Sequence, residues 1–499
     1  MATDWTRVPV VVGAGQVTNR EEDPTRAPDP FDLMARAATD AVTGAGTDMA
    51  SAGISHLWMV HSLSLRHGDP AAALAARLGI MGAETRCSGM GGNIPQWLVN
   101  RAADLVVAGG RPRVLITGAE ALATRRRARK AGVELDWPTA PGWPETWPPL
   151  EPDLGVHPVE RAHGLEAATT MYALVESALA HAQGHDPAAQ RRAMGELMER
   201  FNAVAAANPL SWFATRRHGA EITTATADNR MICFPYPKYC NAVMDVDMGA
   251  AVVITDAATA RSYGLAPEEV AYIGGWADAH EIWYLSERPQ VHSAPGLARC
   301  AQSALTSAGV TLDEVGAFDL YACFPSSVEV ARDSLGIATD DPRPLTLTGG
   351  LQYHGGPGSN YVTHSVANSL GWLRDGHGDV ALVHGNGYYL TKQAVGVYTR
   401  RPPSSVPAPP DRLQERIDGQ GTAVAVDPSF SGTGTILAYT VTYERDGEPG
   451  AGVMVVDTGD AHTVARTDPA TSVSLVADDA VGRAVTVSIS DGGNLARLA

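Results

Sequence analysis

The sequence has few cysteines and no long apolar run. Its five cysteines are an odd number at scattered positions, which indicates reduced thiols and not a disulfide framework. No Cys-x-x-Cys or Cys-x-x-His cluster suggests zinc, and we expect no metal site. No apolar stretch approaches ~20 residues, and the N-terminus leads straight into a strand, so we expect a soluble, cytoplasmic protein. The cysteines are Cys87, Cys233, Cys240, Cys300 and Cys323.

Positive charge is also in short supply. The sequence has 38 Lys and Arg against 55 Asp and Glu, for a formal net charge of −17. This balance argues against non-specific binding to nucleic acids or to anionic membranes. A local basic patch can still hold a phosphorylated small molecule.

The order of the expected elements predicts an α/β protein built of several parts. The chain of 499 residues has room for two to four domains at roughly 100–200 residues each. Strands alternate with helices from residue 8 to about residue 256, and the alternation restarts near residue 270, which predicts two similar halves. The expected parts are residues 1–118 with 246–265, a long insertion 119–245, a second half 266–400, a Pro-rich linker 401–411 and a C-terminal domain 412–499.

The C-terminal domain changes character, because short strands replace the helices. Strands are expected at residues 432–445, 452–457, 471–476 and 484–489, which favours a small β-barrel. The pattern Gly434–Val441 resembles oligonucleotide/oligosaccharide-binding (OB) modules that accompany some thiolase-like proteins. Two roles stay open for this domain, a packing module or lid and a second binding site.

Glycine turns point to a ligand site. The turn Gly89–Gly92 leads into a helix that begins at Asn93, so free backbone N–H groups face any ligand that develops negative charge. Two further glycine turns, residues 349–358 and 385–387, can let backbone approach a ligand or can serve tight packing. A third, Gly13-Ala14-Gly15, lacks the last glycine of a dinucleotide fingerprint, since Thr18 stands there, and we expect no Rossmann site.

Four sequence blocks resemble the thiolase superfamily, and in particular its cysteine-lacking and sterol-carrier-type members. They cover roughly residues 6–400 in the family's order. The resemblance implies the thiolase fold, five αβαβα layers with a loop-domain insertion, and it places Asn93 at the acyl-accepting cysteine, Gly356 at the histidine and Gly385 at the second cysteine. The activity is not inherited with the fold, because all four blocks depart from the pattern. The blocks are Thr117–Glu120, Phe318–Phe324, Thr348–Gly358 and Val383–Gly387.

Titratable side chains near these blocks are the candidates for catalysis. His354 and His384 suit proton transfer near neutral pH, with a pKa of roughly 6.5 in an unperturbed imidazole. Tyr321 can donate to an oxyanion, and Cys323 is either a nucleophile or a buried thiol. Asn93 completes the set at the helix N-terminus.

A basic run and the glycine turns are the candidates for ligand binding. The run from Arg125 to Lys130 is either a solvated helix face or the site of the coenzyme A phosphates, since the resemblance places coenzyme A under the insertion. The candidate ligand-binding residues are Arg125, Arg126, Arg127, Arg129, Lys130, Gly356, Gly358, Ser359, Gly385, Asn386 and Gly387.

Two classes of function therefore remain. In the first, the protein is an acyltransferase, or an enzyme that makes or breaks a carbon–carbon bond of an acyl-CoA, without a cysteine acyl-enzyme. Retro-aldol cleavage is a specific variant. In the second, it is a noncatalytic acyl-CoA-binding or scaffold protein, as a homodimer or as the partner of another subunit. In either class we expect acyl-CoA as the ligand, no covalently bound cofactor and no ordinary thiolase activity.

Overall fold

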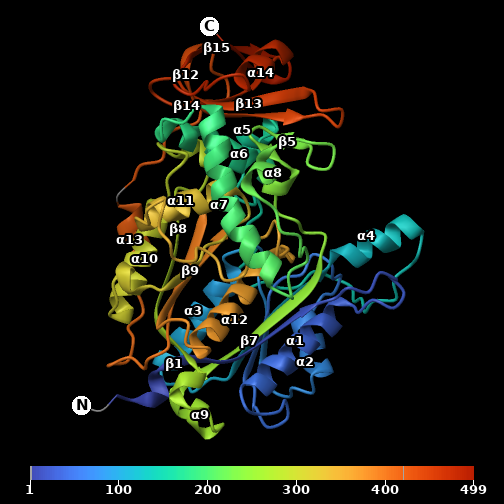
Figure 1. Cartoon of the computed structure of the whole chain (residues 1–499), viewed down its shortest axis with the longest axis vertical. Coiled ribbons are helices and arrows are strands. Elements are labelled where there is room, and N and C mark those ends of the chain that lie inside the picture. The colour runs from blue at the N-terminus through green and yellow to red at the C-terminus, as the bar shows by residue number, and fades with distance from the viewer. Residues whose placement is uncertain (1–2, 420, 499) are drawn as a thin grey trace.

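The computed structural model describes residues 3–419 and 421–498 (Figure 1). A layered α/β body fills the lower part of the view, and a small β domain with the C-terminus lies at the top. Within the described residues, no helix is long and apolar enough to cross a membrane.

Nine strands form one continuous hydrogen-bonded order, β3-β2-β4-β7-β1-β8-β11-β10-β9. Among the described residues the first half contributes five strands and the second half four. The second half repeats the order of the first, without a strand that corresponds to β3. The halves meet where β1 and β8 pair at Val10 and Val11. The strands are β1 (Pro9–Thr18), β2 (His56–Met59), β3 (Glu84–Cys87), β4 (Val114–Ala121), β7 (Asp247–Asp256), β8 (Ala271–His280), β9 (Ala317–Asp319), β10 (Val380–Gly387) and β11 (Lys392–Thr399).

The helices complete the five layers of the thiolase fold. α3 (Ile94–Val107) and α12 (Tyr361–Arg374) contact each other and strands of both halves, so they form the central layer. α1 (Pro30–Gly44) covers strands of the first half, and α10 (Pro295–Ala308) covers those of the second. The remaining helices of these halves are α2 (Pro70–Arg77), α9 (Ala257–Ser262) and α11 (Pro325–Leu335).

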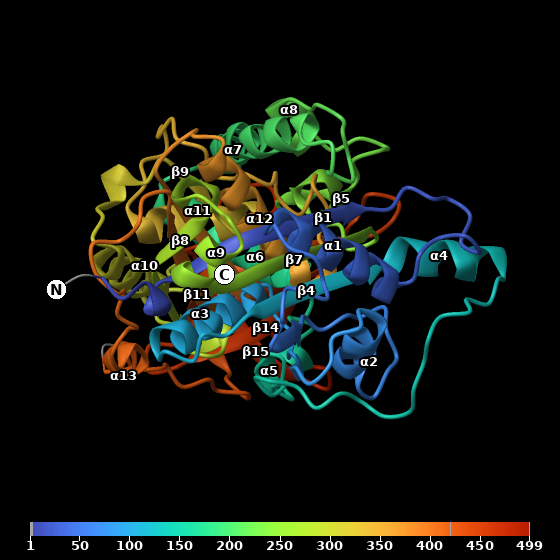
Figure 2. The same ribbon diagram turned by 90° about the horizontal axis from the view of Figure 1, so that it is seen from below.

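The segment between β4 and β7 carries short elements and two long helices. α4 projects from the side of the body, and the chain after it runs back along the side toward α5 (Figure 2). α6 and α7 connect the body to the β domain (Figure 1). The elements are α4 (Leu122–Ala131), α5 (Pro158–Ala162), α6 (Ala168–Ala182), α7 (Pro187–Ala207), α8 (Gly219–Thr223), β5 (Met231–Cys233) and β6 (Tyr236–Pro237).

The C-terminal region contains a closed five-stranded β-barrel, because β12 pairs with both β13 and β15. The barrel is fixed to the insertion: β5 extends its sheet, and Phe234 packs into its core. The elements are α13 (Leu413–Asp418), β12 (Gly432–Tyr443), β13 (Pro449–Asp457), β14 (His462–Thr467), α14 (Pro469–Leu475), β15 (Ala484–Ser490) and β16 (Gly493–Leu498).

Two local predictions were wrong. Residues 471–476 are not a strand, because Asp468 caps a helix that Pro469 begins, which is α14. Gly13 and Gly15 lie inside β1 and form no turn. A Cβ at either position would overlap a backbone carbonyl of α1, so these glycines bring α1 close to the sheet.

Candidate functional site

The turn before α3 presents an asparagine that does not cap its own helix. Gly91 has a φ of +141°, which favours glycine, and it leads into Asn93 at the N-cap. Asparagine at an N-cap usually accepts a hydrogen bond from the first helical turn. Asn93 makes no such bond. Pro95 in the first turn also removes one N–H donor from this end of the helix.

Two glycines of β10 form the surface on which Asn93 lies. A Cβ at Gly385 would lie 2.9 Å from the Cα of Asn93, and one at Gly387 would overlap the Asn93 carboxamide oxygen. Asn93 is 4% exposed, and its Oδ1 has no hydrogen-bond donor among the described residues. This oxygen can accept one more hydrogen bond, and its place between a helix N-terminus and two strand glycines makes it a candidate ligand contact.

Tyr321 closes the other side of the turn. A Cβ at Gly92 would overlap its phenol ring, so the Tyr321 hydroxyl lies against the backbone of the turn. Burial raises the pKa of Tyr321, so the phenol keeps its proton. That hydroxyl has no hydrogen-bond partner in the part of the chain that the structure describes. Burial likewise raises the pKa of the nearby Cys323 thiol to about 11, which disfavours the nucleophilic thiolate.

His354 lies one aromatic ring further from the turn. The Tyr321 and Tyr361 rings are 5.8 Å apart, and the Tyr361 and His354 rings are 6.0 Å apart. Burial and then the neighbouring His364 lower the pKa of His354 well below its usual value. This imidazole therefore stays neutral, and its Nδ1 lies 3.2 Å from Ser211 Oγ.

His384 and Asn386 belong to the opposite face of β10. Side chains alternate along a strand, and Gly385 and Gly387 face Asn93, so His384 and Asn386 point away from it. His384 Nε2 contacts Gln393 Oε1 at 2.8 Å, and burial lowers the pKa of His384 to about 4. Asn386 donates to the Tyr172 hydroxyl at 2.8 Å.

The turn 356–359 of the second half contacts both the Asn93 turn and Glu120 at the end of β4. Ser359 Oγ accepts a hydrogen bond from the Gly91 N–H at 3.1 Å. Gly358 has a φ of +55° and lies against Glu120, while a Cβ at Gly356 would lie 3.0 Å from Leu351. Glu120 is buried and accepts from the backbone N–H groups of Leu63 at 2.7 Å and Ser64 at 2.9 Å.

A polar cluster that the sequence did not single out lies beside the same turn. Lys392 Nζ contacts Glu151 at 3.1 Å and the Met90 carbonyl at 3.4 Å, and the Tyr388 hydroxyl donates to Glu151 at 2.6 Å. Burial lowers the pKa of Lys392, against the raising effect of Glu151. A sequence signal existed, because the chain has only three lysines, and this one follows the glycine turn: Lys130, Lys238 and Lys392.

The chain segment of Glu151 covers the turn. We call residues 144–155 the strap. A Cβ at Gly89 would lie 2.9 Å from the Pro148 carbonyl oxygen, and the Trp147 N–H donates to the Cys87 carbonyl at 2.8 Å. The strap therefore lies against both the edge of β3 and the approach to Asn93.

The basic run forms most of α4 and is partly used within the fold. Arg125 donates to the Leu63 carbonyl at 2.9 Å, Arg126 pairs with Asp245 at 3.1 Å, and Arg127 pairs with the buried Asp247 at 3.1 Å. Arg129 and Lys130 are exposed, and neither has a side-chain partner among the described residues.

The structure thus brings together only some of the predicted residues. Asn93, Tyr321, Ser359, Gly385 and Gly387 meet at one turn. His354 lies behind Tyr361, His384 and Asn386 face away, and the basic run lies on α4, which connects to the site through residues 62–66 and Glu120. The sequence alone does not show which of these residues meet. A shift of one residue in strand register moves a side chain to the other face of the sheet.

Comparisons with known proteins give the family of this chain. The sequence pattern for the additional C-terminal domain of thiolase-like protein type 1 matches residues 412–492. The crystal structure of a monomeric SCP2-thiolase-like protein type 1 from Mycobacterium smegmatis is 33% identical over 100% of both chains, with a TM-score of 0.85. The chain belongs to this family. SCP2-thiolase-like proteins of type 1 thus share with it both the thiolase-type body and the added barrel.

Two more distant structures share the fold of the body. An Ltp2-ChsH2(DUF35) aldolase is 18% identical over 80% of this chain and 99% of that chain, with a TM-score of 0.59. Human mitochondrial 3-ketoacyl-CoA thiolase in complex with CoA is 16% identical over 80% of this chain and 100% of that chain, with a TM-score of 0.55. A comparison with curated proteins gave no match. The two structures in this paragraph are less than 25% identical to this type 1 protein, so they show only a shared fold.

Proposed function

We propose that this SCP2-thiolase-like protein binds an acyl-CoA at the Asn93 turn without forming an acyl-enzyme. The observation that carries the proposal is the buried Asn93 carboxamide, whose Oδ1 has no donor among the described residues and faces the glycines of β10. An amide in this position can exchange hydrogen bonds with a thioester or with the amides of a pantetheine arm. It cannot be acylated as a cysteine can.

The packing also argues against ordinary thiolase chemistry. Gly385, which the resemblance places at the second cysteine, leaves no room for a side chain, since its Cβ would lie 2.9 Å from the Asn93 Cα. Cys323 is buried with a raised pKa. We therefore expect that neither Asn93→Cys nor Asn93→Cys with Gly385→Cys restores thiolysis.

In this proposal the thioester lies at the Asn93 turn, and the coenzyme A arm leads toward the insertion. The turn 356–359 and Glu120 link the Asn93 turn to residues 62–66, and Arg125 contacts that loop. This contiguity supports a position for the phosphates beside α4. Acyl-CoA as the ligand favours a role in lipid metabolism.

Calorimetry tests the proposal. We expect acetyl-CoA to bind the wild-type protein and Asn93→Ala to weaken binding at least tenfold, with no acyl adduct in the mass of the intact protein. Ser429→Ala, an exposed position of the barrel domain, is the control and should bind as the wild type does. No binding at millimolar ligand, or rapid thiolysis of acetoacetyl-CoA, would contradict the proposal.

Tyr321 supports a second candidate, retro-aldol cleavage of a 3-hydroxyacyl-CoA. In that reaction the 3-hydroxyl passes its proton to water, and the Cα–Cβ bond breaks to give a carbonyl compound. Cα of the resulting enolate gains a proton from a general acid, which water then reprotonates. The protonated, unpartnered phenol beside the turn can supply that proton.

Product analysis separates this candidate from simple binding. If it is correct, the protein should release an aldehyde or ketone, and Tyr321→Phe should slow release by about 10²–10⁴-fold. Tyr263→Phe is the matched control, because its hydroxyl donates to the Ala52 carbonyl at 2.8 Å in another part of the fold. If 3-hydroxyacyl-CoA substrates of several acyl-chain lengths give no product, only the binding function remains.

A further inference from the structure

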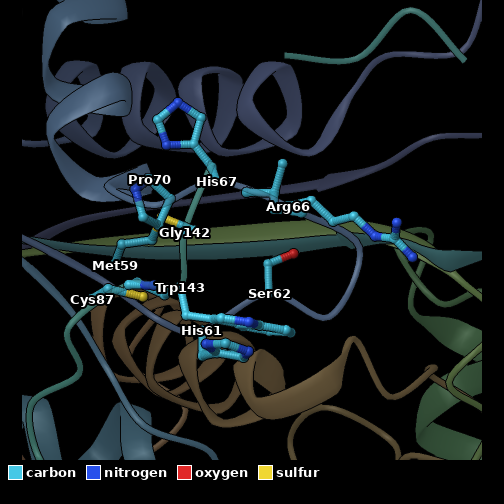
Figure 3. Close-up of a pocket in the computed structure, with 11 residues that line it drawn as sticks. Met59, His61, Ser62, Arg66, His67, Pro70, Cys87, Gly142 and Trp143 are labelled. Atoms are coloured by element: carbon cyan, nitrogen blue, oxygen red, sulfur yellow. The ribbon is translucent and has the colours of Figure 1, made fainter. Parts of the chain in front are cut away.

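Two adjoining hollows lie between α4 and the carboxyl ends of β2 and β3. The first, of about 300 Å³, is lined by His61, Ser62, Cys87 and Trp143 among others (Figure 3). The second, of about 560 Å³, lies along α4. Leu65 and Arg66 line both hollows, so the two are contiguous. We call the first the inner pocket and the second the arginine groove.

The arginine groove concentrates positive charge in an acidic protein. Four arginines line it together with two acidic residues, Glu134 and Asp245. Asp245 is occupied by Arg126. Arg66 and Arg129 have exposed side chains without a partner in the described part of the chain, and Arg66 extends away from the inner pocket in Figure 3. The four arginines are Arg66, Arg125, Arg126 and Arg129.

Such a groove suits a phosphorylated ligand. Guanidinium groups bind phosphate through paired, charge-assisted hydrogen bonds. Arg66 comes from the loop after β2, whereas Arg129 comes from α4, so two separate elements present their charges to one hollow. A solvated face of a single helix does not require this convergence.

The inner pocket has a different character, because apolar residues such as Met59, Leu65 and Pro70 line it. It lies at the carboxyl ends of the parallel strands β2 and β3, marked by Met59 and Cys87. This end of an α/β sheet is the usual place for ligands. Trp143 lines the pocket although it is 88% exposed, and an exposed tryptophan is a common contact surface. From Cys87 the chain continues directly into the Gly89–Asn93 turn.

We infer that the arginine groove and the inner pocket bind the coenzyme A portion of the ligand, with the phosphates on Arg66 and Arg129 and the arm beneath Trp143. This inference rests on the proposed function and adds the route of the ligand and its recognition residues. Arg66 and Trp143 are its new elements. Arg66, together with Leu65, lines both hollows, at the place where the charged nucleotide gives way to the uncharged arm.

A ligand series tests the two hollows separately. Binding of coenzyme A, dephospho-coenzyme A, adenosine 3′,5′-bisphosphate and phosphate-free pantetheine is measured by calorimetry on the full chain. Arg66→Glu with Arg129→Glu should weaken coenzyme A and the bisphosphate at least tenfold and leave pantetheine unchanged. Trp143→Ala should weaken coenzyme A and pantetheine but not the bisphosphate. Arg36→Glu, an exposed arginine of α1, is the control and should change nothing.

The outcomes distinguish the inference from the proposed function. If the double variant binds coenzyme A as tightly as the wild type, the inferred position of the phosphates is wrong. The proposed function would still be supported by the binding of acetyl-CoA to the wild type. If wild-type protein binds the bisphosphate through these arginines but acetyl-CoA binds no better, the groove stands and the thioester site fails. Binding of neither ligand by the wild type overturns both. Circular dichroism of each variant confirms that it is folded.

Discussion

The two central helices begin in the same way and differ in the hydrogen bonds of one side chain. α3 starts at Asn93 and α12 at Asn360, and neither asparagine caps its helix with its side chain. Each lies against a glycine in a strand of the other half, Asn93 on Gly385 and Asn360 on Gly118. Asn360 donates to the Gly118 carbonyl at 2.6 Å and accepts from the Thr363 hydroxyl at 2.6 Å. The Oδ1 of Asn93 has no such donor.

This difference distinguishes a structural asparagine, Asn360, from the asparagine of the candidate site, Asn93. The asparagine–glycine crossing belongs to the fold, because both halves have it. In the second half the crossing is complete, and its polar atoms hold the two sheets together. In the first half one acceptor is left open beside Tyr321 and the strap, so the same framework leaves capacity for a ligand.

The largest effect on stability is expected from a substitution of Asn360. Asn360→Ala removes two buried hydrogen bonds and leaves the Gly118 carbonyl without its partner, so we expect a loss of roughly 2–4 kcal/mol of stability. Asn93→Ala should change stability by less than about 1 kcal/mol, because no hydrogen bond of Oδ1 is lost. Chemical denaturation of both variants measures the difference. Equal losses would show that Asn93 is as structural as Asn360, and would remove the main argument for the site.

Sequence patterns predicted the architecture better than the site. Blocks in fixed order, helix periodicity and the long insertion give the thiolase-type halves, and α7 spans residues 187–207 as expected. The position of Asn93 also followed from the glycine turn before it. These features are local, or they depend on order along the chain.

The partners of the site could not be predicted in the same way. Lys392, Glu151 and the turn at Met90 are far apart in sequence and meet only because the strap folds across β3. His384 shows the same limit on a smaller scale, because the face to which it points depends on strand register. Residues 471–476 show that a good N-cap and a proline override β-favouring residues in a short segment.

The second prediction concerns two buried histidines, His384 on the face of β10 opposite Asn93 and His364 on α12. Burial lowers the pKa of His384 to about 4 and that of His364 to about 3, from about 6.5 in the unfolded chain. The folded state then binds fewer protons than the unfolded state, so stability is lost as the pH falls below 6.5 toward 4. At pH 5 each histidine should cost roughly 2 kcal/mol relative to pH 7.5.

The difference between variants isolates this effect from other titrations. Denaturation at pH 7.5 and at pH 5 should show a smaller loss for His384→Asn than for the wild type. His218→Asn, at a surface position, is the matched control. Identical pH dependence in His384→Asn and wild type would mean that the pKa of this imidazole is the same in the folded and the unfolded chain, which would return it to the groups available for proton transfer near neutral pH.

The smallest effect is expected for the strap, which covers the turn of Asn93. Glu151→Gln removes the charge that Lys392 and Tyr388 share, but Lys392 keeps its contact with the Met90 carbonyl. Since 29% of the Glu151 side chain is exposed, water screens this ion pair, and we expect about 1 kcal/mol or less of lost stability. The effect should be local: hydrogen exchange should quicken for residues 146–155 and stay unchanged around Asn360.

Glu145→Gln is the matched control, because Glu145 lies in the same strap, is exposed and has no partner among the described residues. Unchanged exchange in Glu151→Gln would show that the Pro148 and Trp147 contacts hold the strap alone. Faster exchange with faster ligand association would instead identify the Glu151–Lys392 pair as the contact that keeps the Asn93 turn covered.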